Sequence, residues 1–145
     1  MPSLSHGHAQ DLLEGFKRGW ERRDPEAILA LFGADAEYRA HPYAEPLTGP
    51  NAIRAHWNEI AATQAHVEFD AERIWVSGST VLASWHAAFT RRSSGDRVRV
   101  RGFMAAELGD DMLIERFRQW PLEKVVGKDS THRPEEEQVG GTDGG

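Results

Sequence analysis

Residues 80–108, TVLASWHAAFTRRSSGDRVRVRGFMAAEL, decide the fold of this chain. Every odd position of residues 81–89 is apolar, and every even position of residues 98–108 is apolar or glycine. Alternation with a period of two is typical of a β-strand that buries one face. The intervening SSGD at 93–96 has the composition of a turn. The stretch therefore predicts an antiparallel hairpin with one apolar face.

Two further strands are predicted beside this hairpin. Residues 67–76 alternate apolar and polar side chains, but the parity changes between Ala71 and Ile74, which indicates a β-bulge. A Gly-Asp-Asp turn follows residue 108, and residues 113–120, LIERFRQW, form the last predicted strand. The second half of the chain is thus predicted to be an antiparallel meander.

The first half of the chain has helical periodicity instead. Apolar side chains recur every three or four positions over residues 9–20, and Asp24-Pro25 makes a good N-cap and first turn for a second helix. A short strand is predicted at 37–41, and a third helix begins near Asn51. Helices followed by antiparallel strands indicate the α+β class, with the helices packed on one face of a curved sheet.

The composition excludes several classes of function. The 145 residues contain no cysteine, which rules out disulfides, cysteine-ligated zinc and thiol nucleophiles. A net charge of −6 argues against nucleic acid, which requires a dense Lys/Arg surface. No apolar run is long enough to span a membrane, and residues 1–10 lack the apolar segment of a signal peptide. We therefore expect a soluble, cytoplasmic protein.

The composition also divides the chain. Residues 1–126 hold all five tryptophans and are predicted to fold as one domain. Residues 127–145, GKDSTHRPEEEQVGGTDGG, carry five acidic and two basic side chains with one aliphatic residue. Such a segment buries too little apolar surface to offset its ordering entropy, so we expect an acidic, glycine-rich mobile tail.

The common cofactor motifs are missing from the sequence. It contains no glycine-rich phosphate loop, nucleotide fingerprint, nucleophile elbow or zinc-binding helix signature. Of the seven histidines, two lie near the N-terminus and one in the expected tail, and His41, His56, His66 and His86 fall on four different predicted segments without the spacing of metal ligands. Neither a metal nor a cofactor is therefore expected.

Two stretches resemble a known family. Residues 19–57, GWERRDPEAILALFGADAEYRAHPYAEPLTGPNAIRAHW, and the closing ERFRQW at 115–120 resemble the SnoaL-like branch of the nuclear-transport-factor-2-like superfamily. The resemblance covers most of residues 11–120. It implies a cone-shaped curved antiparallel sheet wrapped around N-terminal helices, with an apolar pocket open at one end. It also implies a homodimer that pairs through the outer face of the sheet.

The ketosteroid isomerases of this superfamily use a carboxylate base and two buried acids that stabilise an oxyanion. The position of the base matches His41, and a histidine side chain, whose reference pKa is about 6.5, can act as a base. The two oxyanion positions match Phe16 and Met104, and neither side chain can donate a hydrogen bond. Because losing one such donor typically costs about 10²–10³ in rate, steroid isomerisation is not expected.

The limonene-epoxide hydrolases use an Asp/Arg/Asp relay with a tyrosine that positions water. Tyr38 matches the tyrosine, but the relay positions fall on Trp85, Ala87 and either Gln119 or Arg118. None of these can act as a carboxylate base, so that relay is excluded. The carboxylate of the polyketide cyclases cannot be placed from the sequence.

The candidate site is therefore assembled from side chains expected near the mouth of the cone and along its wall. The proposed catalytic residues are His41 and Tyr38, although the two cannot both point inward on a regular strand. The expected ligand-binding residues are Phe16, Trp20, Tyr43, Trp57, Trp85, Met104, Phe117, Gln119 and Trp120. We predict that a small hydrophobic molecule binds there. The alternatives are an isomerase, cyclase or dehydratase with His41 as general base, and a non-catalytic dimeric interaction module.

Overall fold

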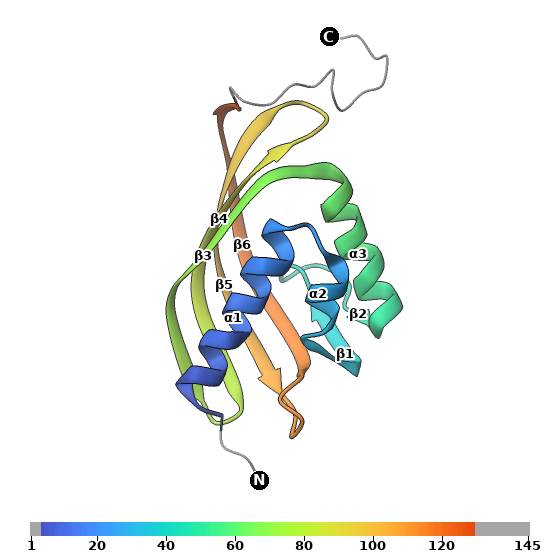
Figure 1. The fold of residues 1–145 in the computed structure, drawn as a ribbon, viewed down its shortest axis with the longest axis vertical. Coiled ribbons are helices and arrows are strands. Elements are labelled where there is room, and N and C mark those ends of the chain that lie inside the picture. Colours follow the sequence, from blue (N-terminus) through green and yellow to red (C-terminus); the bar gives the residue numbers. More distant parts are fainter. Residues whose placement is uncertain (1–3, 130–145) are drawn as a thin grey trace.

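A computed structural model describes residues 4–129 of the chain. The elements are α1 (His6–Glu21), α2 (Pro25–Leu29), β1 (Phe32–Arg39), β2 (Leu47–Thr48), α3 (Pro50–Thr63), β3 (Gln64–Ser77), β4 (Thr80–Arg91), β5 (Asp96–Leu108) and β6 (Ile114–Lys128). The six strands form one sheet in the order β2-β1-β6-β5-β4-β3. Figure 1 shows this curved sheet with the three helices on its inner side, as the α+β prediction requires.

The second and third helices begin where the sequence predicts, and the first begins at His6. Ser5 caps α1, since its hydroxyl accepts a hydrogen bond from the backbone N–H of His8 at 3.1 Å. Asp24 caps α2 in the same way through Ala27, and Pro25 occupies the first turn, so the predicted Asp-Pro start is confirmed. The inward side of α1 buries its apolar residues against the sheet: Ala9, Leu12, Leu13, Phe16 and Trp20.

The strands β3 to β6 form the predicted meander. The register between β3 and β4 shifts between Ala71 and Arg73, which confirms the predicted bulge. The first strand differs from the prediction: β1 covers residues 32–39 instead of 37–41 and pairs in parallel with β6. Its start is fixed by the pairing of Phe32 with Ile114, a long-range contact that local sequence patterns do not reveal.

The last strand is longer than expected. It runs to Lys128, past the predicted end of the strand at residue 120 and past the predicted domain end at residue 126. Its far half pairs with β5, for example Val100 with Glu123. The rest of the expected tail, residues 130–145, lies outside the described residues.

The two faces of the sheet differ in burial. The inner face carries the apolar side chains of the 80–108 hairpin, which are buried as predicted: Val81, Ala83, Trp85, Ala87, Phe89, Val98, Val100, Met104, Ala106 and Leu108. The outer face exposes a row of aromatic side chains, Trp75, Phe103 and Trp120. Within residues 4–129 no helix has the length and apolar character needed to cross a membrane.

Candidate functional site

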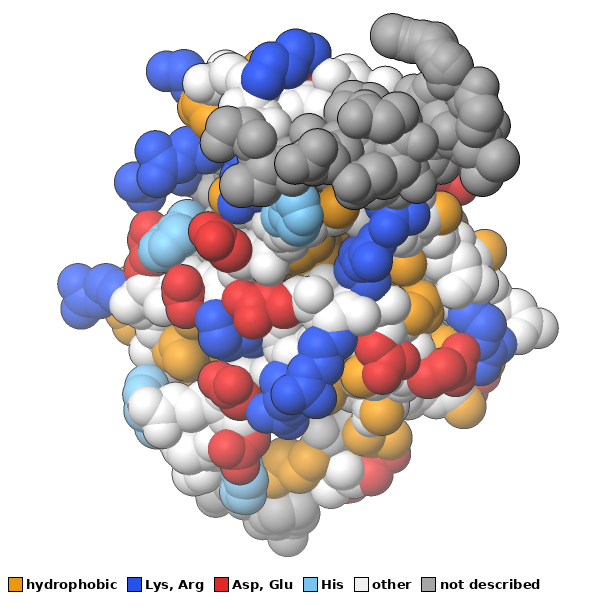
Figure 2. All heavy atoms as spheres, turned by 45° about the horizontal axis from the view of Figure 1, so that its top comes forward, with side chains coloured by type: hydrophobic (Ala, Val, Ile, Leu, Met, Phe, Trp, Pro, Cys, Tyr) orange, Lys and Arg blue, Asp and Glu red, His pale blue; other side chains and the backbone are white. Residues whose placement is uncertain are grey.

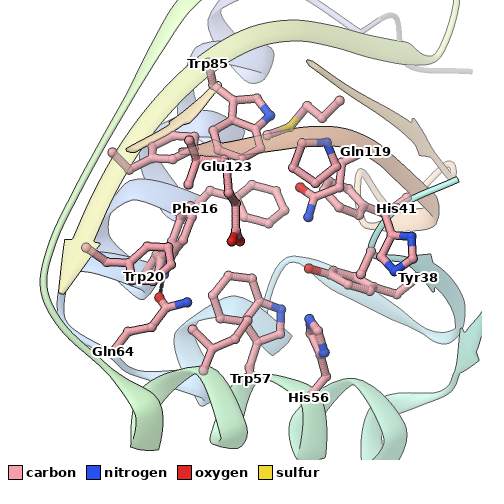
Figure 3. A pocket seen from close by; sticks show the side chains of 18 residues that line it. Phe16, Trp20, Tyr38, His41, His56, Trp57, Gln64, Trp85, Gln119 and Glu123 are labelled. Carbon is pink, nitrogen blue, oxygen red and sulfur yellow. Dashed lines mark hydrogen bonds between the residues drawn. The ribbon is translucent and has the colours of Figure 1, made fainter. Parts of the chain in front are cut away.

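A cavity of about 240 Å³ lies inside the cone, between the inner face of the sheet and helices α1 and α3. Figure 3 shows aromatic side chains from helices and strands converging on this space. Nine of the side chains expected at the site line it: Phe16, Trp20, Tyr38, His41, Trp57, Trp85, Met104, Phe117 and Gln119. The structure thus brings together residues that are up to 103 positions apart in the sequence, from Phe16 to Gln119.

Two expected residues do not belong to the cavity. The side chain of Tyr43 is 96% exposed on the loop after β1, because the chain leaves the sheet at Arg39 and carries this residue outward. Trp120 lies on the outer face and is 40% exposed, because its neighbours Gln119 and Pro121 take the inner positions of β6. Tyr43 and Trp120 therefore lie outside the lining of this cavity.

Sequence reasoning missed three polar residues of the lining: His56, Gln64 and Glu123. Glu123 was missed because the last strand was ended at residue 120; continuing its odd positions would have found it. His56 and Gln64 lie on α3 and at its C-cap, and no local signal marks them as pocket residues. The missed apolar lining residues are Ala40, Ile60, Phe69, Phe89, Val100 and Pro121.

Three tryptophans form much of the wall. The ring of Trp20 meets those of Trp57 and Trp85 edge-on, with centroid distances of 5.8 and 5.9 Å. The indole N–H of Trp20 donates to Oε1 of Gln64 at 2.8 Å. The indole nitrogens of Trp57 and Trp85 are buried and make no hydrogen bond. The wall is therefore mainly apolar, with two unsatisfied donors.

Tyr38 connects the strand to the cavity. Its ring stacks on Phe117 with a centroid distance of 4.8 Å, and its hydroxyl points into the cavity (Figure 3). Burial raises the pKa of this hydroxyl, so it remains protonated at neutral pH. The strand ends at Arg39, which leaves His41 free of the strand parity. Tyr38 and His41 can therefore both line the cavity, Tyr38 buried and His41 exposed.

The charged side chains of the site lie at the mouth of the cavity. The Glu123 carboxylate pairs with Nη2 of Arg91 at 3.0 Å, and both side chains are about half exposed. Glu123 is the one carboxylate among the lining residues of the described chain. Within residues 4–129, no group of three or more His, Asp or Glu side chains is arranged to hold a metal ion.

His56 makes folding sensitive to pH. Its half-buried ring lies 5.2 Å from that of Tyr38, and burial lowers its pKa below the ordinary 6.5. Below pH 6.5 the unfolded chain therefore takes up a proton that the folded chain resists. We expect the free energy of unfolding to fall as the pH drops from about 6.5 through the lowered pKa, and to be insensitive to this group at higher pH.

Urea unfolding of the wild type and of His56→Gln between pH 7.5 and pH 5 measures this effect. The variant should lose part of the decrease in the acidic range. An identical pH dependence in both proteins would contradict a role for His56.

A curved sheet that encloses a cavity against three helices defines a class of cone-shaped α+β domains. The SnoaL-like domain model matches residues 13–117, so the chain belongs to the SnoaL-like family, and the resemblance seen in the sequence is confirmed. A comparison with curated proteins gave no match.

Solved structures share this fold. The epoxide hydrolase/cyclase-like enzyme SalBIII, described in pyran ring formation in the polyether salinomycin, is 16% identical with a TM-score of 0.74, covering 84% of this chain and 98% of that one. An LEH-like epoxide hydrolase from Mycobacterium tuberculosis is 19% identical with a TM-score of 0.67, covering 80% and 84%. A protein with a ketosteroid isomerase-like fold from Catenulispora acidiphila, in complex with trimethylamine, is 16% identical with a TM-score of 0.69, covering 76% and 84%. At these identities the similarity shows the fold alone.

Proposed function

We propose that this domain binds a small, mostly apolar molecule inside the cone. The observation that carries the proposal is the cavity of about 240 Å³ at the centre of the core, walled by aromatic side chains. Protein interiors are normally packed as densely as organic crystals, with few spaces larger than a water molecule. A space of this size among otherwise buried side chains is therefore unusual, and we interpret it as a binding site for a ligand.

The size and the lining limit the ligand. Ligand pockets are typically about 300–1,000 Å³, so this cavity lies just below the lower end of that range and suits a molecule of one or two rings. Apolar side chains dominate the wall, and the few polar groups come from different elements: Tyr38, His41, His56, Gln64, Gln119 and Glu123. This combination supports binding through apolar burial, with orientation set by a few polar contacts.

A cavity-filling variant tests the proposal. Val100 is 3% exposed and lines the cavity, so Val100→Phe places an aromatic ring in the space that the ligand would occupy. We expect affinity for norbornane, a compact apolar probe, to fall at least about tenfold, because one site cannot hold both rings. Stability should be kept, since the added ring fills space instead of displacing neighbours. Titration calorimetry and urea unfolding measure the two effects.

Val98→Phe is the matched control. Val98 lies on the same face of β5 and is fully buried, but it does not line the cavity. The added ring should overpack the core and cost about 1–3 kcal/mol of stability. Equal loss of stability in both variants, or unchanged norbornane affinity in Val100→Phe, would overturn the proposal.

The enzymatic alternative gives His41 the role of general base in an isomerase, cyclase or dehydratase. It is supported by the presence of His41 in the same lining as the protonated hydroxyl of Tyr38, which could donate to a substrate oxygen. Against it stands the exposure of His41, because a solvated base lacks the water-free surroundings that strengthen catalytic electrostatics. We therefore favour binding over catalysis.

We also propose that two copies pair through the outer face of the sheet. Trp75, Phe103 and Trp120 form an exposed row there, with centroid distances of 6.0 and 6.2 Å between neighbours. A groove beside this row has acidic side chains from β3, Glu68, Asp70 and Glu72, and basic ones from β5 and β6, Arg99, Arg101 and Lys124. A two-fold arrangement would place the acidic side of one copy opposite the basic side of the other.

The surface pattern agrees with a protein partner better than with nucleic acid. Figure 2 shows acidic and basic side chains mixed over one face of the molecule, with hydrophobic side chains exposed between them. Nucleic-acid binding needs a continuous basic surface to displace counterions.

A further inference from the structure

We propose that the ligand of the cavity is uncharged and carries oxygen acceptors, such as the carbonyl of a ketone, that face the indole N–H groups of Trp57 and Trp85. This inference rests on the proposed function and specifies the chemical class of the ligand. Its evidence is the unequal hydrogen bonding of three tryptophans that line one cavity.

The three indoles differ in whether their donor is satisfied. The N–H of Trp20 donates to Gln64, whereas those of Trp57 and Trp85 make no hydrogen bond within the described residues. The side chains of Trp57 and Trp85 are 6% and 2% exposed, so bulk water does not reach them. An indole nitrogen can only donate, and leaving a buried donor unpaired is costly. A ligand oxygen would remove that cost.

The donor of Trp57 lies where a ligand can use it. Its nitrogen is directed toward the Tyr38 hydroxyl, which points into the cavity (Figure 3). The indole is close enough to counteract part of the rise in the Tyr38 pKa, but the geometry falls short of a hydrogen bond. Because burial keeps Tyr38 protonated, this corner of the cavity presents two donors, an N–H and an O–H.

The donor of Trp85 lies on the opposite wall, formed by the sheet. The indole is held over the backbone of Gly102, where a Cβ would come within 2.2 Å of its Cζ2 atom. It also packs on Phe69 with a centroid distance of 5.5 Å. Its nitrogen lies on the edge of the ring nearer to Gln119 (Figure 3). The Trp85 ring is thus held in place, and a hydrogen-bond acceptor for its N–H would have to be part of a bound molecule.

The charges of the lining exclude an anionic ligand, and the two unpaired donors do not favour a cationic one. No Lys or Arg occurs among the described residues that line the cavity, and Glu123 at the mouth is paired with Arg91. An anion would therefore be buried without a cation and would face a carboxylate, which is strongly unfavourable. A cation would leave the N–H groups of Trp57 and Trp85 unpaired, since both can only donate. A neutral molecule with oxygen acceptors needs no cation in the lining and can accept from both N–H groups.

Four probes with one carbon skeleton test the class: norbornane, 2-norbornanone, norbornane-2-carboxylate and 2-aminonorbornane, each titrated into the full-length wild-type protein by calorimetry. We expect the ketone to bind at least as tightly as the hydrocarbon, although taking its carbonyl out of water is unfavourable. The carboxylate and the amine should bind at least about tenfold more weakly.

Three matched variants then locate the donor: Trp57→Phe, Trp85→Phe and Trp20→Phe. Each removes one indole N–H and a similar volume, so the ratio of ketone to hydrocarbon affinity isolates the hydrogen bond from the lost packing. The ratio should fall about tenfold in Trp57→Phe or in Trp85→Phe, and should be kept in Trp20→Phe, whose N–H already has a partner.

The outcomes separate this inference from the proposed function. Norbornane binding with an unchanged ratio in both Trp57→Phe and Trp85→Phe would overturn the oxygen acceptor and leave the binding function standing. Tighter binding of the carboxylate or the amine would overturn the neutral class. Failure of the hydrocarbon and the ketone alike to bind would overturn the proposed function and this inference with it.

Discussion

Gly102→Ala is expected to lower the free energy of unfolding by about 1–3 kcal/mol and to abolish binding of 2-norbornanone. Trp85 and Gly102 are register partners on β4 and β5, so both face the inside of the cone. A Cβ at residue 102 would lie 2.2 Å from Cζ2 and 2.3 Å from Cε2 of the indole. Atoms at such distances must move apart, and the neighbour is a rigid ring that is 2% exposed.

The cavity offers the indole space into which it can move. Trp20 and Phe69 pack against it within the core, with centroid distances of 5.9 and 5.5 Å, and the cavity adjoins its remaining side. Displacement into the cavity reduces the space for a ligand and redirects the Trp85 N–H. The same substitution therefore affects stability and binding through one displaced side chain.

Gly33→Ala provides the matched control. Gly33 is also a strand glycine, in β1, but a Cβ there would meet its nearest neighbour, the carbonyl oxygen of Ile114, at an ordinary 3.5 Å. The stability of the Gly33→Ala variant in urea should equal or slightly exceed that of the wild type, because alanine restricts the conformations of the unfolded chain. If Gly102→Ala unfolds at the wild-type urea concentration, the close packing of Trp85 on residue 102 is wrong.

The fold was predictable because its main signals are local. The period-two pattern of residues 80–108 gives the strands, their inner face and their hairpin, and the parity change after Ala71 gives the bulge. The limits of β1 and β6 were not predictable in this way. Both depend on pairing between segments far apart in the chain, such as Phe32 with Ile114 and Asp96 with Lys128. Exposed strand residues near the end of β6 leave little hydrophobic pattern to read.

The candidate site was predictable only in part, for a related reason. Large apolar side chains on the inner faces of predicted elements could be assigned to a pocket, and nine of the eleven expected residues line it. Polar lining residues such as His56 and Gln64 depend on how α3 lies against the sheet, which no sequence period encodes. An aromatic residue such as Trp120 suggests burial, whereas its strand parity assigns it to the outer face.

The second large effect concerns self-association through the outer face of the sheet. Phe103→Glu is expected to weaken self-association on the order of 100-fold, the equivalent of about 2.8 kcal/mol. Phe103 is the middle member of the exposed row, between Trp75 and Trp120, and is 36% exposed. In a two-fold pair a carboxylate at this position would be buried among aromatic rings and repelled by its counterpart in the other copy.

Sedimentation velocity over a range of protein concentrations measures the change, and circular dichroism verifies that the variant stays folded, as its partial exposure predicts. Tyr43→Glu is the control, because it replaces an aromatic residue by the same acid at a site that is 96% exposed and away from the sheet. The wild type and Tyr43→Glu should sediment as dimers and Phe103→Glu as a monomer. A monomeric wild type, or a Phe103→Glu variant that still dimerises, would remove the outer face as the pairing surface. Because the cavity lies on the other side of the sheet, 2-norbornanone affinity should be the same in all three proteins.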